Sequence, residues 1–259
     1  MRVIDLNSDL GEDISIDGLT AEQLDDALLQ IVTSANVACG GHAGDLASMS
    51  GICARAGELG VRVGAQISYV DRAGFGRRRL DVPTDLLTEQ LLEQLTALTA
   101  CARAVGTDVT YVKPHGALYN AAMDADEPAL AVVNAILRDA DARGSALPVL
   151  SLANSTLASL AQQHGISVFI EAFADRGYTA TGRLVPRTET GAVITDEAEV
   201  QARVLTMIND RYVTSIDGVD VPFTAQSICV HSDTSGALNL ASMLRKALED
   251  NGIQLRAFA

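Results

Sequence analysis

The sequence predicts an α/β fold, a seven-stranded (β/α) barrel-like structure formed as one domain over residues 1–259. Short apolar runs alternate with longer segments of helical periodicity, which is typical of parallel β/α units. Polar residues recur where the short runs end, and parallel barrels build their active sites at these ends. A chain of 259 residues, 48% of them hydrophobic, can form one such domain with a full core.

Each predicted strand is a short apolar run, and a helical pattern follows it. In chain order, the strands are expected at residues 3–7, 31–36, 61–66, 109–113, 147–151, 168–171 and 227–230. The helices are expected at residues 20–30, 45–59, 83–105, 127–142, 155–164, 197–209 and 235–250, with Asp45 as the N-cap of the second. About 24 residues separate the sixth strand from the next helix, more than a usual βα connection, so this segment is a candidate lid.

Polar side chains follow six of the seven strands. Because side chains two apart on a strand share a face, Asp5, Asn7 and Asp9 are expected to point the same way. The other strand ends lead into Asn36 and His42, Gln66 and Asp71, Lys113 and His115, Glu171, Asp175 and Arg176, and His231 and Asp233. These side chains are predicted to gather around one site, with Lys113 and His115 at its centre.

Lys113 and His115 give the strongest local signal. Lys113 is one of only two lysines and lies in an apolar stretch, where burying a charge costs free energy that function usually explains. Lys113 can hold an anionic group or polarise a carbonyl, and His115 can transfer a proton near neutral pH. The structural alternative is a lysine–carboxylate pair.

Asp5 and Asp9 are candidates for a general base or, with Glu12, for oxygen ligands of a divalent cation. The alternative is that such residues cap turns and helix starts. His42 lies among three glycines before a helix, a setting that favours an anion or simply makes a tight turn. Arg176 or Arg187 can grip a carboxylate, or can be a solvated surface residue.

Composition excludes several functions. A net charge of −14 disfavours nucleic acid and anionic membranes, and the only basic run is residues 77–79. The chain has neither a G-x-x-x-x-G-K-[ST] nucleotide loop nor an 18-residue apolar run, and its start lacks the apolar core of an export signal. Four widely spaced cysteines form no C-x-x-C pair. We expect a cytoplasmic protein with reduced thiols.

Seven ordered motifs carry a resemblance to the LamB/YcsF family, whose members are the A subunit of bacterial 5-oxoprolinase. The motifs are IDLNSDLGE, TSANVACGGHAGD, GFGRR, VKPHGALYN, EAFADRGY, LVPR and ICVHSD, and they extend from Ile4 to about Asp233. The resemblance implies a barrel like that of the glycoside hydrolase/deacetylase superfamily. It also implies ATP-dependent opening of 5-oxoproline (pyroglutamate), a lactam, to glutamate, together with subunits called B and C.

On this hypothesis the partners handle ATP, and this chain binds an activated anionic substrate and directs water to its ring carbon. Catalysis falls to Asp5, Asp9, Lys113 and His115. Substrate binding falls to Asn7, Asn36, His42, Gln66, Glu171, Asp175, Arg176, His231 and Asp233.

The chain departs from the family pattern at two places. Gln66 and Ile67 replace a common His-Pro, and Ser232 replaces a usual glycine. Glutamine is no ordinary histidine-type metal ligand, so no metal is predicted. A metal-dependent deacetylase of an amidated sugar and a non-catalytic lactam-binding subunit remain alternatives. Oligomeric state stays open, a homo-oligomer included.

Overall fold

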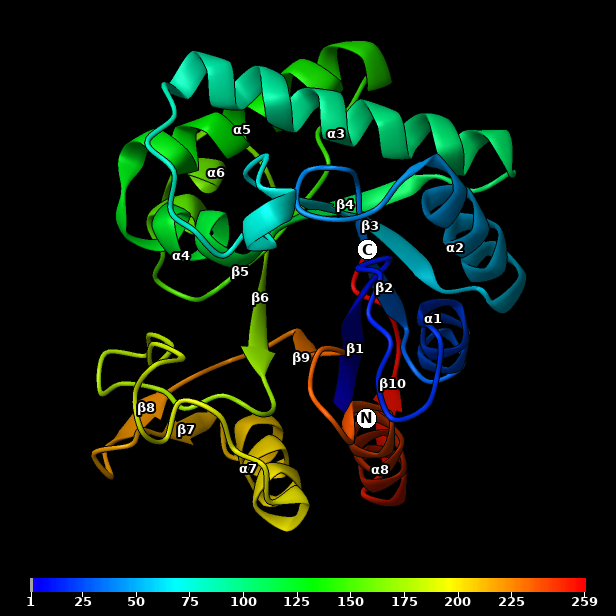
Figure 1. Ribbon diagram of the computed structural model, residues 1–259. Coiled ribbons are helices and arrows are strands. Elements are labelled where there is room, and N and C mark those ends of the chain that lie inside the picture. The colour runs from blue at the N-terminus through cyan, green and yellow to red at the C-terminus, as the bar shows by residue number, and fades with distance from the viewer. Residues whose placement is uncertain (1) are drawn as a thin grey trace.

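Seven parallel strands close into a barrel in the computed structural model, which describes residues 2–259 (Figure 1). The barrel order is β1-β2-β3-β4-β5-β6-β9, and β9 pairs again with β1 to close it. The strands are β1 Arg2–Leu10, β2 Ser34–Ala38, β3 Arg62–Ile67, β4 Val109–Pro114, β5 Val149–Ser151, β6 Val168–Phe173 and β9 Ser227–Val230. The predicted seven-stranded α/β barrel is confirmed.

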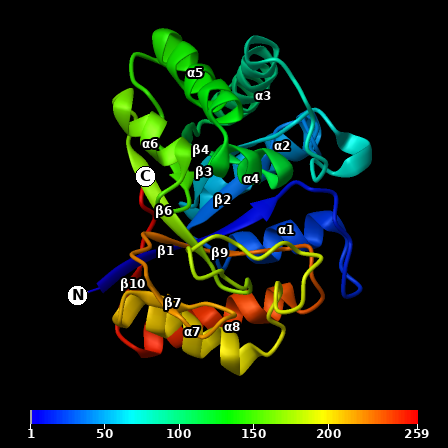
Figure 2. The ribbon, with the colours of Figure 1, turned by 90° about the vertical axis from the view of Figure 1, so that its left-hand side faces the viewer.

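Eight α-helices surround the barrel, and Figure 2 shows them on its outside. They are α1 Ala21–Leu29, α2 Leu46–Leu59, α3 Thr84–Ala104, α4 Gly116–Asp124, α5 Asp126–Arg143, α6 Thr156–Gln163, α7 Glu197–Asn209 and α8 Ala237–Asp250. Asp45 is the N-cap of α2, as expected, since its side chain accepts a hydrogen bond from the Ser48 amide. Within the described residues, no helix combines the length and apolar character that a bilayer crossing requires.

Several short elements were not predicted. Helix α4 starts directly after β4 and so overlaps the motif around His115. A hairpin of β7 Tyr212–Thr214 and β8 Asp220–Pro222 follows α7, and β10 Ile253–Leu255 extends the sheet beside the start of β1. A 3₁₀ turn, η1, covers Arg72–Gly74. Strands of three residues carry too little alternation to stand out in a sequence.

Two strand boundaries differ from the prediction in ways that matter. The second strand begins at Ser34 rather than at residue 31, because the amides of Ile31 and Val32 still bond to the Leu28 carbonyl at the end of α1. The first strand continues to Leu10 rather than ending at residue 7. Asp9 therefore lies on the strand itself, and its direction is fixed by the barrel.

The barrel interior is polar toward the carboxyl ends of the strands. Register places Asp9 beside Asn36, Asn36 beside Gly64, and Gly64 beside Tyr111. Gly64 has no room for a side chain, since a Cβ there would lie 2.1 Å from Cζ of Tyr111. The Tyr111 ring thus crosses the interior and its hydroxyl donates to Asn36 Oδ1 over 2.6 Å.

Candidate active site

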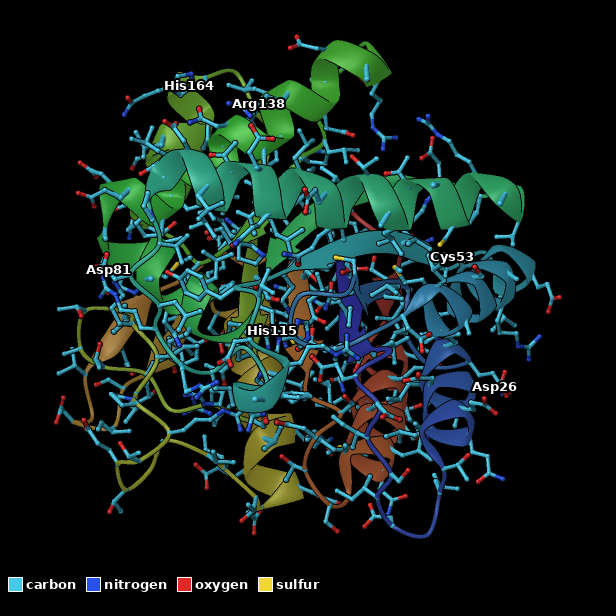
Figure 3. The ribbon with its side chains drawn as sticks, turned by 45° about the horizontal axis from the view of Figure 1, so that its top comes forward. Asp26, Cys53, Asp81, His115, Arg138 and His164 are labelled. Atoms are coloured by element: carbon cyan, nitrogen blue, oxygen red, sulfur yellow. The ribbon has the colours of Figure 1, made fainter. Side chains whose placement is uncertain are left out.

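A pocket of about 600 Å³ opens at the carboxyl ends of the strands, the position expected for a parallel barrel. Its volume lies in the range of small-molecule sites. Figure 3 shows His115 near the centre of the molecule, whereas the labelled Asp26, Arg138 and His164 lie at the periphery. The charged and aromatic residues that line the pocket are Asp9, Glu12, Arg77, Lys113, His115, Tyr119, Asp124, Phe173, Arg176, Arg183, Arg187, His231 and Asp233.

Lys113 is buried at the base of this pocket and is paired with two carboxylates. Its ammonium lies 3.2 Å from Asp9 Oδ1 and 3.1 Å from Glu171 Oε2, and it donates to Asn7 Oδ1 and Cys229 Sγ. Burial alone would lower the pKa of Lys113, but these neighbours raise it well above its usual value. Lys113 is therefore charged, and its charge is already matched within the protein.

Asp9 is held ionised by the same arrangement. Burial would raise its pKa, but the charges of Lys113, His231 and His115 hold the pKa of this carboxyl well below its usual range. Asn36 Nδ2 also donates to Asp9 Oδ1 over 2.8 Å. A carboxylate that is fixed, ionised and open to the pocket can orient a water molecule.

Asp5 lies deeper, away from the pocket. Its carboxylate accepts hydrogen bonds from the hydroxyls of Thr33, Ser34 and Ser227, and the side chain is fully buried. Burial, only partly offset by these donors, raises the pKa of Asp5 to about 6. Among the candidate bases, the pocket therefore presents Asp9 rather than Asp5.

The Asp5 pKa leads to a testable effect of pH on stability. Its folded pKa exceeds the unfolded one, so its contribution to stability is complete below the unfolded pKa and is lost as pH rises through about 6. Between about pH 4 and pH 7, wild type should lose about 3 kcal/mol relative to Asp5→Asn, which cannot titrate. Urea unfolding of both proteins at the two pH values measures this loss. A stability difference that stays constant with pH would contradict it.

Glu12, His42, Gln66 and His115 form a second buried cluster beside Asp9. Glu12 Oε1 lies 3.1 Å from His42 Nε2, 3.0 Å from Gln66 Nε2 and 3.3 Å from His115 Nδ1. Burial raises the pKa of Glu12 to about 7, and burial lowers the pKa of each histidine to about 4. Both imidazoles are therefore neutral at pH 7. Only Glu12 and His115 of this cluster line the pocket.

His231 forms a third part of the site with Asp175. Its Nδ1 lies 3.0 Å from Asp175 Oδ1. Burial would lower the pKa of His231, but the Asp175 carboxylate raises it above its usual value. Phe173 stacks on the His231 ring at 5.3 Å and lies 5.4 Å from the Lys113 ammonium. The aromatic ring thus separates two cationic groups.

Residues 174–196, the predicted candidate lid, form one wall of the pocket. Arg176 folds this segment rather than facing the pocket freely: its Nε donates to the Ala192 carbonyl at 2.9 Å and its Nη2 to the Val185 carbonyl at 2.7 Å. The carboxylate grip expected of Arg176 falls instead to residues nearer solvent, of which Arg187 lines the pocket with a partly exposed side chain.

The pocket rim carries arginines that the sequence patterns did not assign to the site. Arg77 pairs with Asp233, and Arg187 Nη2 lies 3.9 Å from the other oxygen of that carboxylate. Arg183 lines the same wall and pairs with the exposed Asp124. The GFGRR motif could have suggested Arg77, but no sequence signal separated Arg183 from an ordinary surface residue.

Tyr119 and Glu171 line the inner wall with unused hydrogen-bonding capacity. Within residues 2–259, neither the Tyr119 hydroxyl nor the Glu171 carboxylate has a hydrogen-bond partner in good geometry, although both are buried. Buried polar groups of this kind are costly unless something bonds to them. Tyr119 was missed in the sequence because it lies in α4, which was not predicted.

These features define a class: an α/β-barrel protein with a charged small-molecule pocket at the carboxyl ends of its strands. The chain belongs to the LamB/YcsF family, whose model matches residues 4–259. It is 50% identical over 257 residues to the 5-oxoprolinase A subunit of Streptomyces coelicolor, covering 99% of this chain and all of that protein. It is 48% identical over 258 residues to the 5-oxoprolinase A subunit of Mycobacterium avium, with full coverage of both.

Solved structures agree with this assignment. The lactam utilization protein of Thermus thermophilus superposes with a TM-score of 0.89 at 36% identity, covering both chains fully. The catalytic domain of a peptidoglycan N-acetylglucosamine deacetylase from Eubacterium rectale gives a TM-score of 0.52 at 11% identity, covering all of this chain and 89% of that one. The second match shows a shared fold alone, which is the deacetylase-like barrel that the sequence resemblance implied.

Proposed function

We propose that this chain provides the lactam-opening site of a 5-oxoprolinase, and that it works as a single cytoplasmic domain with two partner subunits, B and C, and ATP. The reaction would convert 5-oxoproline and water to glutamate. The names of its relatives support the substrate. The observation that carries the catalytic part is the ionised Asp9 carboxylate, held by Lys113 at the base of an arginine-rimmed pocket.

The charge distribution of the pocket favours one orientation of this substrate. At the base, Lys113 faces two carboxylates, Asp9 and Glu171, which disfavours a further anion there. At the rim, Arg77 and Arg187 share one carboxylate, that of Asp233, and so retain positive charge. The carboxylate of 5-oxoproline would bind the rim arginines, as is usual for guanidinium groups. Its ring carbonyl would then point inward.

The chemical step is hydrolysis of the ring amide. Asp9 orients a water molecule and accepts its proton as the water oxygen bonds to the ring carbonyl carbon. The C–N bond then breaks, the nitrogen takes a proton, and the products are the amino group and side-chain carboxylate of glutamate. The Lys113 ammonium holds Asp9 in place and stabilises negative charge that develops nearby.

ATP dependence fits the properties of this base. Because Lys113 and its neighbours hold the pKa of Asp9 well below its usual range, Asp9 is always ionised but is a weak proton acceptor. Such a base suits a carbonyl that has been activated first. Phosphorylation of the lactam oxygen by a partner would supply that activation, and the pocket has room for a phosphoryl group beside the ring.

A reconstitution assay tests the proposal. The purified chain is combined with its B and C partners, and glutamate release from 5-oxoproline is measured with and without ATP. We expect glutamate only when ATP and all three chains are present. Turnover by the partners alone at the full rate would show that the lactam-opening site lies elsewhere.

A further inference from the structure

The cluster of Glu12, His42 and His115 lies beside the proposed catalytic carboxylate but has no part in the steps above. All three side chains are buried, and one ligand atom from each lies within 4.8 Å of the others. The directions of their hydrogen bonds decide what this cluster can hold.

His42 directs an unprotonated nitrogen at Glu12. The Ser68 hydroxyl donates its single hydrogen to the Tyr69 carbonyl at 3.0 Å, so it can only accept from His42 Nδ1, which lies 3.0 Å away. The neutral His42 ring therefore carries its hydrogen on Nδ1. Its Nε2, 3.1 Å from Glu12 Oε1, is a bare acceptor.

His115 does the same from the opposite side. Its Nε2 lies 3.1 Å from the Phe75 carbonyl, which can only accept, so the ring hydrogen is on Nε2. Its Nδ1 is bare, accepts from Gln66 Nε2 at 3.0 Å, and lies 3.3 Å from Glu12 Oε1. Two imidazole lone pairs thus converge on one carboxylate oxygen, and Gln66 supplies a single amide donor among them.

The other candidate cluster shows what is missing here. Asp9, Cys229 and His231 also bring three ligand atoms together, but the Lys113 ammonium lies 3.2 Å from both Asp9 and Cys229. That cluster already contains a cation. Within the described residues, no lysine or arginine pairs with Glu12, whose only ion-pair partners are the two neutral histidines.

We propose that Glu12, His42 and His115 bind a divalent transition metal, zinc first, at the wall of the pocket. Two neutral imidazoles and one carboxylate are a donor set of catalytic zinc sites, which keep a further position open. In a tetrahedral site with bonds of about 2.0–2.1 Å, ligand atoms lie about 3.3–3.4 Å apart. The separations of 3.1 and 3.3 Å around Glu12 Oε1 match that spacing.

Two further observations bear on this site. Gln66 Oε1 is buried without a hydrogen-bond partner, and rotation of the amide would bring this oxygen to the cluster as an added ligand. The rings of His42 and His115 are stacked at 3.7 Å with 6° between their planes. A metal lies near the plane of each ligating ring, so binding requires the two rings to tilt apart. Glu12 and His115 line the pocket, which gives the ion a path of entry.

Metal titration of the purified chain tests this site without reference to turnover. After chelator treatment, the protein is titrated with Co²⁺, followed by visible absorption, and with Zn²⁺ in competition. We expect one ion per chain with a four- or five-coordinate cobalt spectrum. Glu12→Gln and His115→Phe should each weaken binding by at least about 100-fold, since even outer partners of metal ligands are worth 10–100-fold. Cys229→Ser, in the other cluster, should bind like wild type.

Histidine ring NMR gives a second readout on the folded protein. Without metal, His42 should carry its proton on Nδ1 and His115 on Nε2, and zinc should shift the signals of the two bare nitrogens. Wild type that binds no metal, or that binds it equally well after both Glu12 and His115 substitutions, would overturn the proposal. In the first case the cluster would hold a shared proton instead.

Discussion

Replacing Lys113 by methionine is expected to abolish glutamate release in the complex with B and C and to destabilise the fold by about 3–5 kcal/mol. The substitution keeps the length of the side chain but leaves two buried carboxylates, Asp9 and Glu171, without their cation. Breaking a buried ion pair from one side typically costs this amount, because the remaining charge is uncompensated. Urea unfolding and the reconstitution assay measure the two effects.

The chain offers a matched control for this substitution. Lys246, the only other lysine, is largely exposed and pairs with Asp250 one helical turn away in α8. Such pairs are worth a few tenths of a kcal/mol, so Lys246→Met should leave both turnover and stability nearly unchanged. A Lys113→Met protein that turned over at the wild-type rate would remove Lys113 from the mechanism.

Asp9→Asn is expected to lower turnover by about 10²–10⁴-fold, the range for loss of a positioned proton acceptor. Asparagine keeps the shape and can accept the hydrogen bond from Asn36, but it cannot take a proton from water. Lys113 keeps its second carboxylate partner, Glu171, so the folded state should persist. Single-turnover glutamate formation, with thermal unfolding in parallel, measures the effect.

Asp13→Asn is the control for Asp9. Asp13 is exposed in the loop after β1 and has a φ of 57°, a left-handed conformation that asparagine also tolerates. Its variant should retain turnover. If Asp9→Asn instead kept full turnover while 5-oxoproline still bound, the chain would be better described as a non-catalytic lactam-binding subunit.

The fold was largely readable from the sequence. Apolar periodicity and the seven strand-like runs predicted the parallel barrel, because each β/α unit must bury one apolar face against its neighbours. Period-two spacing also predicted that Asp5, Asn7 and Asp9 share a face. The structure places all three on the polar inner side of β1, where Lys113 reaches Asn7 and Asp9.

The chemistry of individual residues was less readable. Asp5 and Asp9 are equivalent in sequence pattern, yet three hydroxyl donors surround one and a buried ammonium faces the other. Arg176 was expected to bind substrate, but its guanidinium is engaged by backbone carbonyls of its own loop. These differences arise from contacts between residues far apart in the chain, and local patterns do not encode such contacts.

The sequence by itself therefore determined the barrel, the family and the strand ends around Lys113 and His115. Tertiary structure alone decided which carboxylate faces the pocket, which arginines form its rim, and which nitrogens of His42 and His115 are bare. The physical reason is that periodicity depends on burial, a local and additive property. Charge state and hydrogen-bond direction depend instead on the full set of neighbours that barrel closure brings together.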